Sequence, residues 1–362
     1  MTFITVAGQT VPWLLIALVA AAALSFVLTP LVRRLALRFD AVDVPGHRRV
    51  NTLPVPRGGG VAVAAAFIAV TLGLTALNSF ARFVNIPPTI DGRDLLGLLL
   101  GGILATAFGV VDDAFDLRAR WQFAGQLGLA LFAIACGFLV DFISNPIGPG
   151  ILRFGPFATG FTVLWIAGMI NSINFIDGLD GLSTGIGLIA ALTLGTISLT
   201  TQVSQPFVAI LCFALAGSLL GFLRWNFHPA RIFAGTSGVM FLGYTLALLS
   251  ILGTAKVAVA MLVLGVPIID AFWIIVRRLV QGRSPFTPDR GHIHHRLLDL
   301  GLSHRQTVLL IYAVCAGLGA LAMLLSGATQ LYAFAGVFVA SGFVLLILAR
   351  GGFTPGAPEL ED

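Results

Sequence analysis

The sequence predicts an all-α, polytopic integral membrane protein with about eleven membrane-spanning helices. Of its 362 residues, 57% are hydrophobic and only 10% are charged, whereas a soluble domain carries roughly a quarter charged residues. Many stretches of about 18 or more residues lack charge, which is long enough to cross ~30 Å of hydrocarbon as a helix. Arg33 and Arg34 follow the first apolar stretch and no basic residue precedes it. We therefore expect a retained helix rather than a signal peptide.

Eleven apolar stretches, separated by short polar segments, are each predicted to form a helix. They cover residues 11–32, 58–77, 94–111, 121–141, 157–173, 184–201, 206–223, 237–253, 256–276, 306–326 and 329–349. No internal repeat or long linker is visible, so residues 1–350 are predicted to form one domain. Residues 351–362 contain proline and all the glutamate of the chain, and they are predicted to be a disordered tail.

The distribution of basic residues predicts the orientation, because Lys and Arg accumulate on the cytoplasmic side of a membrane. With the N-terminus outside, 17 of the 21 Lys and Arg residues fall in cytoplasmic segments. The C-terminus is then cytoplasmic, and we expect a multi-pass protein of the inner (plasma) membrane. Anionic lipid headgroups account for the net charge of +5 without any nucleic-acid partner. The three cysteines lie in apolar stretches and form neither a disulfide framework nor a metal motif.

The stretch GVVDDAFDL places three carboxylates at the end of the third predicted span. Asp112, Asp113 and Asp116 have the i,i+3 and i,i+4 spacings of one helical edge. Carboxylates so placed repel one another, and a hard divalent cation such as Mg²⁺ would relieve the repulsion. The structural alternative is that Asp113 and Asp116 pair with Arg118 and Arg120 at the lipid interface.

The stretch NSINFIDGLDGLSTG repeats Asn or Asp at every third position. Asn171, Asn174, Asp177 and Asp180 would line one edge of a helix end. Polar side chains at membrane depth face protein or water rather than lipid. The pattern therefore predicts a wet cavity open to the cytoplasm. The alternative, a helix cap with a glycine turn, requires one such residue and not four.

Two further stretches suit the binding of an anion. DVPGHRRVNTLPVPRGGG supplies Arg48, Arg49 and Arg57 before three glycines that allow close backbone approach. NFHPARIFAGTSG begins the eighth predicted span with small residues, so that free N–H groups and the positive helix end face the cavity. The alternatives are a stop-transfer arginine cluster and an ordinary short loop.

The stretch RSPFTPDRGHIHHRL brings histidines and arginines together in one loop. His292, His294 and His295 lie among Arg290 and Arg296. Three histidines are a ligand set for zinc, but the flanking arginines and the lack of cysteine favour contacts to an anion. A solvated basic loop is the structural alternative.

Taken together, these stretches combine a carboxylate cluster suited to Mg²⁺ with cationic groups suited to phosphate. This combination is typical of phosphoryl transfer, in which positioning and charge neutralisation supply most of the catalysis. A membrane-embedded cavity points to a lipid phosphate as one reactant. Its cytoplasmic mouth points to a soluble, nucleotide-activated molecule as the other.

GVVDDAFDL, NSINFIDGLDGLSTG and SPFTPDRGHIHHRL, in this order, resemble the motifs of the polyprenyl-phosphate N-acetylhexosamine-1-phosphate transferases. The resemblance runs from about Asp43 to Leu300, and the HIHH form is more similar to the undecaprenyl-phosphate GlcNAc-1-phosphate branch than to the MurNAc-pentapeptide branch. It implies the fold of the phospho-MurNAc-pentapeptide transferases, with ten or eleven helices, often dimeric. It also implies dependence on Mg²⁺, with Mn²⁺ as an alternative.

The resemblance implies that GlcNAc-1-phosphate, or another N-acetylhexosamine-1-phosphate, passes from its UDP-sugar to undecaprenyl phosphate with release of UMP. This would be the first membrane step of a cell-envelope glycan. The implied catalytic and metal-binding residues are Asp112, Asp113 and Asp177, and the implied substrate-binding residues are Arg48, Asn174, Asp180, Phe233, Arg290, His292, His294 and His295. Phe233 matches a position that stacks on uracil, and the three histidines match a loop that contacts the pyrophosphate.

The sequence departs from the family pattern at two positions. Thr236 stands where an Asp usually serves as a Mg²⁺ ligand, and Asn51 stands where many members have His. Thr236 keeps a second reading open, that of a non-catalytic relative that binds lipid phosphate. A phospho-MurNAc-pentapeptide transferase is a further alternative. A transporter is disfavoured, because it requires polar residues in the middle of several spans and here they gather at one face.

Overall fold

The computed structural model describes residues 2–43, 54–148, 150–200, 203–252, 257–284 and 291–350. Most of them are helical, as predicted. The helices are α1 (Thr2–Arg38), α2 (Gly60–Ala81), α3 (Gly92–Phe115), α4 (Ala119–Ala135), α5 (Ala158–Ile176), α6 (Leu182–Ser198), α7 (Pro206–Asn226), α8 (Gly235–Ile251), α9 (Val257–Val263), α10 (Gly265–Val280), α11 (Ile293–Asp299), α12 (His304–Leu324) and α13 (Ala328–Arg350). Two short hairpins pair β1 (Val42–Asp43) with β2 (Val55–Pro56) and β3 (Phe142–Ser144) with β4 (Ile151–Arg153). A 3₁₀ turn, η1 (Gly155–Phe157), precedes α5.

Each of the eleven predicted apolar stretches falls on a helix, but the ninth is not one straight span. It divides into α9 and α10, which are bent by 78° relative to each other. Pro267 lies in the first turn of α10 and favours a break here, because proline has no N–H to continue the hydrogen bonds of α9. Residues 351–362, predicted to be a tail, lie outside the described residues.

Within the described residues, six helices are long and apolar enough to cross a membrane, and the bent pair α9–α10 would make seven. The apolar helices α6 and α8, and the part of α13 up to Phe343, are shorter. The structure therefore supports an all-α membrane protein, while the total of eleven spans and their orientation stay predictions.

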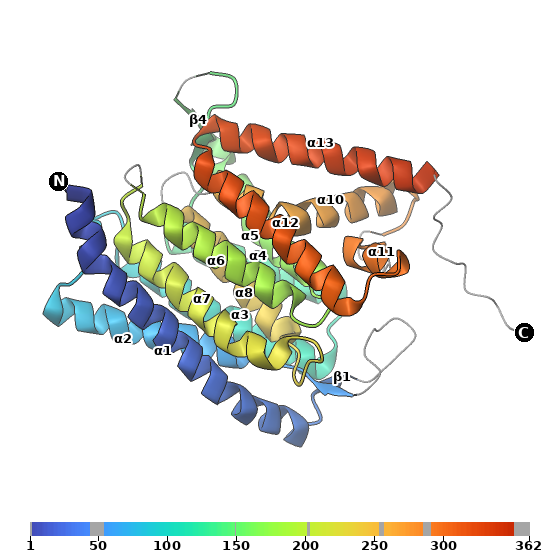
Figure 1. Cartoon of the computed structure of the whole chain (residues 1–362), viewed down its shortest axis with the longest axis horizontal. Coiled ribbons are helices and arrows are strands. Elements are labelled where there is room, and N and C mark those ends of the chain that lie inside the picture. The colour runs from blue at the N-terminus through green and yellow to red at the C-terminus, as the bar shows by residue number, and fades with distance from the viewer. Residues whose placement is uncertain are drawn as a thin grey trace, which may run out of the picture.

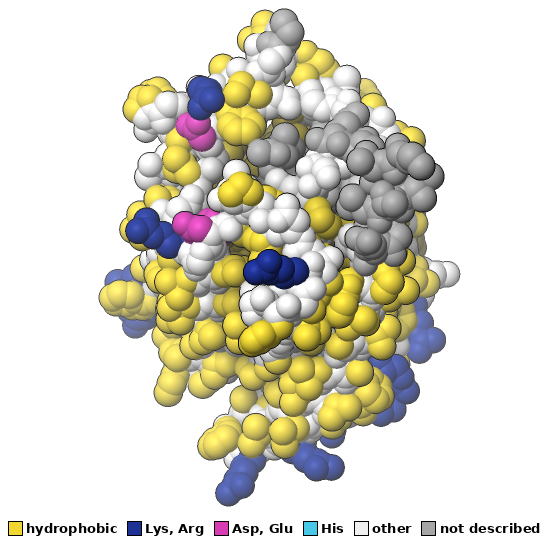
Figure 2. Space-filling model, turned by 90° about the vertical axis from the view of Figure 1, so that its left-hand side faces the viewer, with side chains coloured by type: hydrophobic (Ala, Val, Ile, Leu, Met, Phe, Trp, Pro, Cys, Tyr) yellow, Lys and Arg dark blue, Asp and Glu magenta, His cyan; other side chains and the backbone are white. Residues whose placement is uncertain are grey.

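Helices α7 and α8 lie at the centre of the bundle, with α1 and α2 on one side and α13 on the other (Figure 1). Every side chain of α8 from Ser237 to Ser250 is buried, as expected of a helix that is apolar all round. The outer helices expose large apolar side chains such as Val19, Leu72 and Phe80. In Figure 2 hydrophobic side chains cover most of the lower half of the face shown, with few charged groups among them.

Glycines allow the central helices to cross at very short distances. A Cβ atom on Gly60 of α2 would lie 2.1 Å from the Cα of Gly238 in α8, and one on Gly109 of α3 would lie 2.3 Å from the Cα of Ser237. Small residues at such crossings let backbones approach inside a membrane. The result is that the start of α2 and the end of α3 both meet the first turn of α8, where the polar residues gather.

The contact between α1 and α7 also depends on a glycine at a close crossing, and this gives a first test. A Cβ on Gly221 of α7 would lie 2.1 Å from the carbonyl oxygen of Ala22, whereas one on Gly73 of α2 would meet nothing within 4 Å. We expect Gly221→Ala to destabilise the protein by about 1–3 kcal/mol through overpacking. Gly73→Ala should be neutral or slightly stabilising. Thermal unfolding in detergent measures both, and equal melting temperatures would contradict the close crossing.

Candidate functional site

A polar cavity of ≈ 290 Å³ lies at one end of the bundle, where the end of α3, the α5–α6 turn and the start of α8 converge. Figure 1 shows α11 and β1 at this same end. The cavity is lined by Asp43, Arg57, Asp113, Asn174, Asp177, Gly178, Leu179, Asp180, Asn226, Phe233, Ala234, Gly235, Thr236 and His295. Eight of the residues singled out from the sequence therefore line this cavity: Arg57, Asp113, Asn174, Asp177, Asp180, Phe233, Thr236 and His295.

Asp113 is fixed against the N-terminus of α8. One carboxylate oxygen accepts the N–H of Thr236 at 2.7 Å and the other accepts the N–H of Ser237 at 3.1 Å. A negative charge at the positive end of a helix is stabilised both by these donors and by the helix dipole. Each carboxylate oxygen has a further lone pair, so Asp113 can also bind a cation or donor in the cavity.

Asp177 follows the last residue of α5 and faces the same cavity. The hydroxyl of Ser183 donates to its carboxylate. Burial raises the pKa of Asp177 to about 6, the bond from Ser183 lowers it, and the charges of Asp113 and Asp180 raise it further. Asp113 and Asp177 are thus two acidic groups that repel each other across one cavity.

Asp112 and Asp116 do not join this pair among the cavity residues that the structure describes. Buried Asp112 accepts the N–H of Leu117 at 3.1 Å and the side-chain N–H of Gln122 at 2.8 Å, closing the α3–α4 turn. Asp116 lies beyond the end of α3 with φ +46°, and its exposed carboxylate is 3.3 Å from Arg57. The expected single edge of three carboxylates fails, because α3 ends at Phe115 and adjacent residues point about 100° apart on a helix.

Arg57 brings positive charge to the cavity. Its Nε donates to buried Asp43 at 2.8 Å, and Asp43 belongs to the β1–β2 hairpin. The backbone after this hairpin bonds to the segment that precedes α8: the N–H of Phe233 donates to Pro56 and its carbonyl accepts from Gly59. Arg57 and the ring of Phe233 are therefore held on the same wall. Arg48, Arg49, Asn51 and Arg290 lie outside the described residues.

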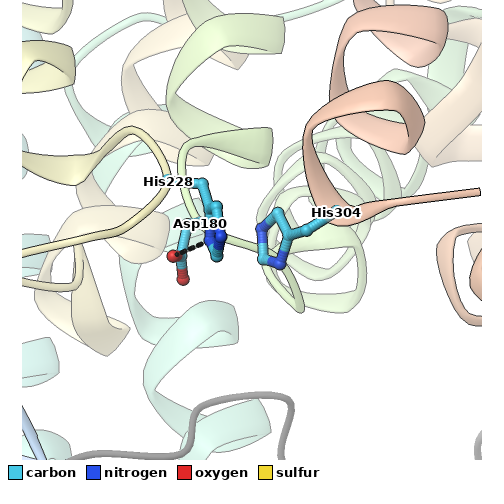
Figure 3. Close-up of side chains that lie close together, drawn as sticks. All are labelled: Asp180, His228 and His304. Atoms are coloured by element: carbon cyan, nitrogen blue, oxygen red, sulfur yellow. Dashed lines mark hydrogen bonds and ion pairs between the residues drawn. The ribbon is translucent and has the colours of Figure 1, made fainter.

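Asp180 is bound to the α7–α8 loop. One carboxylate oxygen accepts the N–H of Ala230 at 3.0 Å and lies 2.8 Å from the Nδ1 of His228. The ring of His228 stacks on that of His304, with 4.1 Å between ring centres. Figure 3 shows the three side chains converging from the α5–α6 turn, the α7–α8 loop and the start of α12.

The HIHH stretch (His292–His295), predicted as a loop and called the HIHH loop below, leads from the N-cap His292 into the first turn of α11. Asp270, a residue of α10, anchors it. Its two oxygens bind the Nδ1 of His292 at 2.8 Å and the N–H of Ile293 at 2.9 Å. Asp270 falls within the ninth predicted span, residues 256–276, and no partner for it was evident from the sequence. An isolated carboxylate within a span was the available signal, since such a group needs a partner.

His294 is 1% exposed and packs on Gly178, where a Cβ atom would lie 2.2 Å from its Nε2. Neither of its ring nitrogens has a hydrogen-bond partner among the described residues. Burial, followed by the charges of His295, His292 and His304, lowers its pKa well below the usual value, so the ring is neutral near pH 7.

A second, larger cavity of ≈ 920 Å³ extends along α4, α5 and α10. Its walls are mainly apolar, with Phe161, Leu164 and Phe272 among them, while Arg278 and His292 lie on its lining as well. The two cavities meet at four residues that line both: Asn174, Asp177, Gly178 and His295. The arrangement suits an apolar chain with an anionic head placed beside a polar, charged ligand.

Comparison with known proteins identifies the family. The chain is 36% identical over 327 residues, 89% of its length and 87% of the relative, to the "Probable undecaprenyl-phosphate N-acetylglucosaminyl 1-phosphate transferase" of Bacillus subtilis. It is 33% identical to the decaprenyl-phosphate N-acetylglucosaminephosphotransferase of Mycobacterium tuberculosis, with 84% of the chain and 81% of the relative covered. The family model for glycosyl transferase family 4 matches residues 95–254. The chain belongs to glycosyl transferase family 4.

The Escherichia coli undecaprenyl-phosphate alpha-N-acetylglucosaminyl 1-phosphate transferase, another relative, is 28% identical over 81% of the chain and 78% of its own length. The residues matched by the glycosyl transferase family 4 model run from the start of α3 past the end of α8. They include Asp113, Asp177 and Asp180, whereas the HIHH loop lies beyond them.

The packing of His294 on Gly178 gives a second test. Gly178→Ala would place a Cβ atom against the His294 ring, so we expect the HIHH loop to shift and His294 to become accessible. Gly168→Ala, in the same helix-and-turn region but with open space around it, is the matched control. Histidine modification by diethyl pyrocarbonate, read by mass spectrometry, should rise severalfold at His294 only in Gly178→Ala. Equal modification in both variants would show that the contact does not hold the loop.

Proposed function

We propose that this protein transfers N-acetylglucosamine 1-phosphate from UDP-N-acetylglucosamine to undecaprenyl phosphate and releases UMP. The observation that carries the proposal is that the polar cavity meets the larger apolar cavity, called the apolar groove below, at Asn174, Asp177, Gly178 and His295. A nucleotide-sugar suits the first space and a polyprenyl phosphate suits the second. The printed names of the relatives, all N-acetylglucosamine phosphate transferases acting on a polyprenyl phosphate, support the same pair of substrates.

The donor is assigned to the polar cavity. Phe233 offers an aromatic face for the uracil, and Asn174 and Asp180 offer hydrogen-bonding groups for the nucleotide-sugar. Arg57 and His295 lie on the same lining and can contact phosphate oxygens. Arg48 and Arg290 are proposed to add to this positive charge.

The acceptor is assigned to the apolar groove, with its phosphate at the junction. Arg278, 4% exposed, is held with its guanidinium 5.7 Å from the ring centre of Phe175. Together with His292, it supplies the groove with groups that suit a phosphate head. The apolar walls exclude water, which strengthens these contacts.

The residues present fit a magnesium ion at the polar cavity. Mg²⁺ is commonly held by one or two carboxylates together with substrate phosphates and water, and Asp113 and Asp177 supply two carboxylates whose mutual repulsion a cation relieves. Bound there, Mg²⁺, or Mn²⁺ in its place, would neutralise charge on the diphosphate. Thr236 contributes at most a hydroxyl. Asp112 is assigned to positioning, because it closes the turn after α3.

Transfer requires an oxygen of the lipid phosphate to form a bond to the sugar-bearing phosphorus. The bond from this phosphorus to the bridging oxygen breaks, and that oxygen leaves with UMP. The contribution of the chain is to align the two phosphates and to balance their charge. Neutral His294 packs on the turn that carries Asp177 and keeps that turn in place. Asp270 fixes His292 in turn.

The position of the protein in the membrane follows from the same proposal. We place eleven spans in the inner (plasma) membrane with the N-terminus outside, so that the cavity opens to the cytoplasm, where UDP-sugars are found. A homodimer is proposed from the family resemblance alone.

A radiolabelled or chromatographic assay of UMP release tests the function. Purified protein, undecaprenyl phosphate and Mg²⁺ should release UMP with UDP-N-acetylglucosamine, more slowly with other UDP-N-acetylhexosamines. Preference for UDP-MurNAc-pentapeptide would favour a phospho-MurNAc-pentapeptide transferase instead. No release with any donor, together with retained binding of the lipid phosphate, would favour a non-catalytic relative.

Substitution of the two cavity carboxylates tests the site. Asp113→Asn and Asp177→Asn should each lower kcat by at least about 100-fold, since each removes one charge that holds the diphosphate through the metal. Asp299→Asn, at an exposed position in α11, should retain full turnover as a control. The melting temperature of each variant shows whether it is folded. Turnover that survives both cavity substitutions in folded protein would refute the assignment.

A further inference from the structure

Asp180, His228 and His304 form a compact group beside the polar cavity. Each side chain offers one ligand atom, and these atoms all lie within 4.8 Å of one another. They come from three parts of the chain: the α5–α6 turn, the α7–α8 loop and the first residue of α12 (Figure 3). We infer that this group is a binding site for a transition-metal ion of the Zn²⁺ type, distinct from the magnesium site assigned to Asp113 and Asp177.

The ligand types favour Zn²⁺ over Mg²⁺. Two imidazoles and one carboxylate are a common ligand set for Zn²⁺, with the fourth position taken by water or another ligand. Mg²⁺ prefers six oxygens and rarely binds imidazole. The two proposed sites therefore select different metals.

The distances allow the site to close. Zn–N and Zn–O bonds of ~2.0–2.1 Å in a tetrahedron place the ligand atoms about 3.3 Å apart. The Nδ1 of His228 and the Oδ2 of Asp180 are already 2.8 Å apart, and a ring nitrogen of His304 lies within 4.8 Å of both. Closing the site therefore requires His304 to move toward them and to give up its stacking on His228. Within the described residues neither ring nitrogen of His304 makes a hydrogen bond of good geometry, and its remaining interaction is with the backbone of Asp180, a ligand of the same site.

The state without metal is compatible with binding. A neutral His228 carries one ring proton, which the bond to Asp180 places on Nδ1. Binding through Nδ1 moves this proton to Nε2, so a neutral ring loses no proton overall. The backbone of the loop is already fixed, because the Nη2 of Arg305 donates to the carbonyl of His228 at 3.2 Å and Ala230 donates to Asp180.

Metal binding would tie α12 to the wall of the cavity. Asp180 lines the cavity and His304 begins α12. The Tyr312 hydroxyl of α12 already donates to the carbonyl of Gly181 in the same turn, and an ion held by Asp180 and His304 would add a second connection. The readout for this inference is metal affinity, which does not require turnover. A protein that binds no Zn²⁺ but releases UMP would refute only the zinc site, and one that binds Zn²⁺ but releases no UMP would refute only the proposed transfer reaction.

Full-length protein, purified in detergent and stripped with a chelator, would be titrated with Zn²⁺ in competition with a chromophoric chelator and in excess Mg²⁺. We expect one saturable site, a Zn²⁺-dependent rise in melting temperature, and affinity at least tenfold weaker in His304→Gln and His228→Gln. His304→Cys, which keeps a zinc ligand, should retain binding. His295→Gln controls for the HIHH loop and should bind within about threefold of the unmodified chain.

Two outcomes would overturn the inference. The first is the absence of saturable binding to the folded, unmodified protein. The second is unchanged affinity in folded His304→Gln together with loss in His295→Gln, which would place the ion at the HIHH loop. If His304→Gln does not fold, His228→Gln and the His304→Cys variant provide the same comparison.

Discussion

The site depends on how closely α2 and α3 approach the first turn of α8. Gly60, Gly109 and Gly238 leave no room for side chains at these crossings, so the N–H groups of Thr236 and Ser237 reach the Asp113 carboxylate. A buried carboxylate is costly unless donors or opposite charge compensate it. Here the end of a helix supplies that compensation, and the close crossing puts it in place.

The close approach of α3 to α8 also affects the charges in the cavity. Asp113 is compensated by α8, whereas Asp177 is compensated mainly by one hydroxyl and has its pKa raised to about 6 by burial, with the neighbouring carboxylates adding to the rise. The cavity thus places a carboxylate that is hydrogen-bonded to the end of a helix beside one that has a single hydroxyl partner. A bound cation would reduce the repulsion between the two. Arg57 is paired with Asp43 and Asp116, so its charge only partly offsets that of the two cavity carboxylates.

The sequence predicted the helical class, because long uncharged stretches have no other stable form in a membrane. It also predicted that polar residues of NSINFIDGLDGLSTG gather at a cavity, and Asn174, Asp177 and Asp180 line one. The predicted helical edge of four residues was wrong, because α5 ends at Ile176 and Asn171 lines the apolar cavity instead. It was less successful with Asp112, because the end of α3 decides which neighbouring residue faces the cavity. Helix spacing alone does not specify that end.

Other parts of the site depend on contacts between distant segments, which no local pattern reveals. Asp270 meets His292 across 22 residues, and Asp180 meets His228 across 48. The bend between α9 and α10 also required the structure, although Pro267 was visible in the sequence. A proline in the first turn is tolerated in many helices, so its effect depends on what the preceding helix packs against.

The substitution at Thr236 is easier to understand with the cavity in view. A carboxylate at this position would stand in the first turn of α8, next to the two N–H groups that bind Asp113, and would add a third acidic group to a pair that already repels. Threonine keeps the N–H contact to Asp113 and removes that repulsion. Because Mg²⁺ needs only one or two carboxylates when substrate phosphates complete its coordination, the expected result is weaker binding of the metal alone. In the proposed reaction the donor diphosphate would supply the remaining oxygens, so we expect the metal and the donor to bind together rather than in sequence.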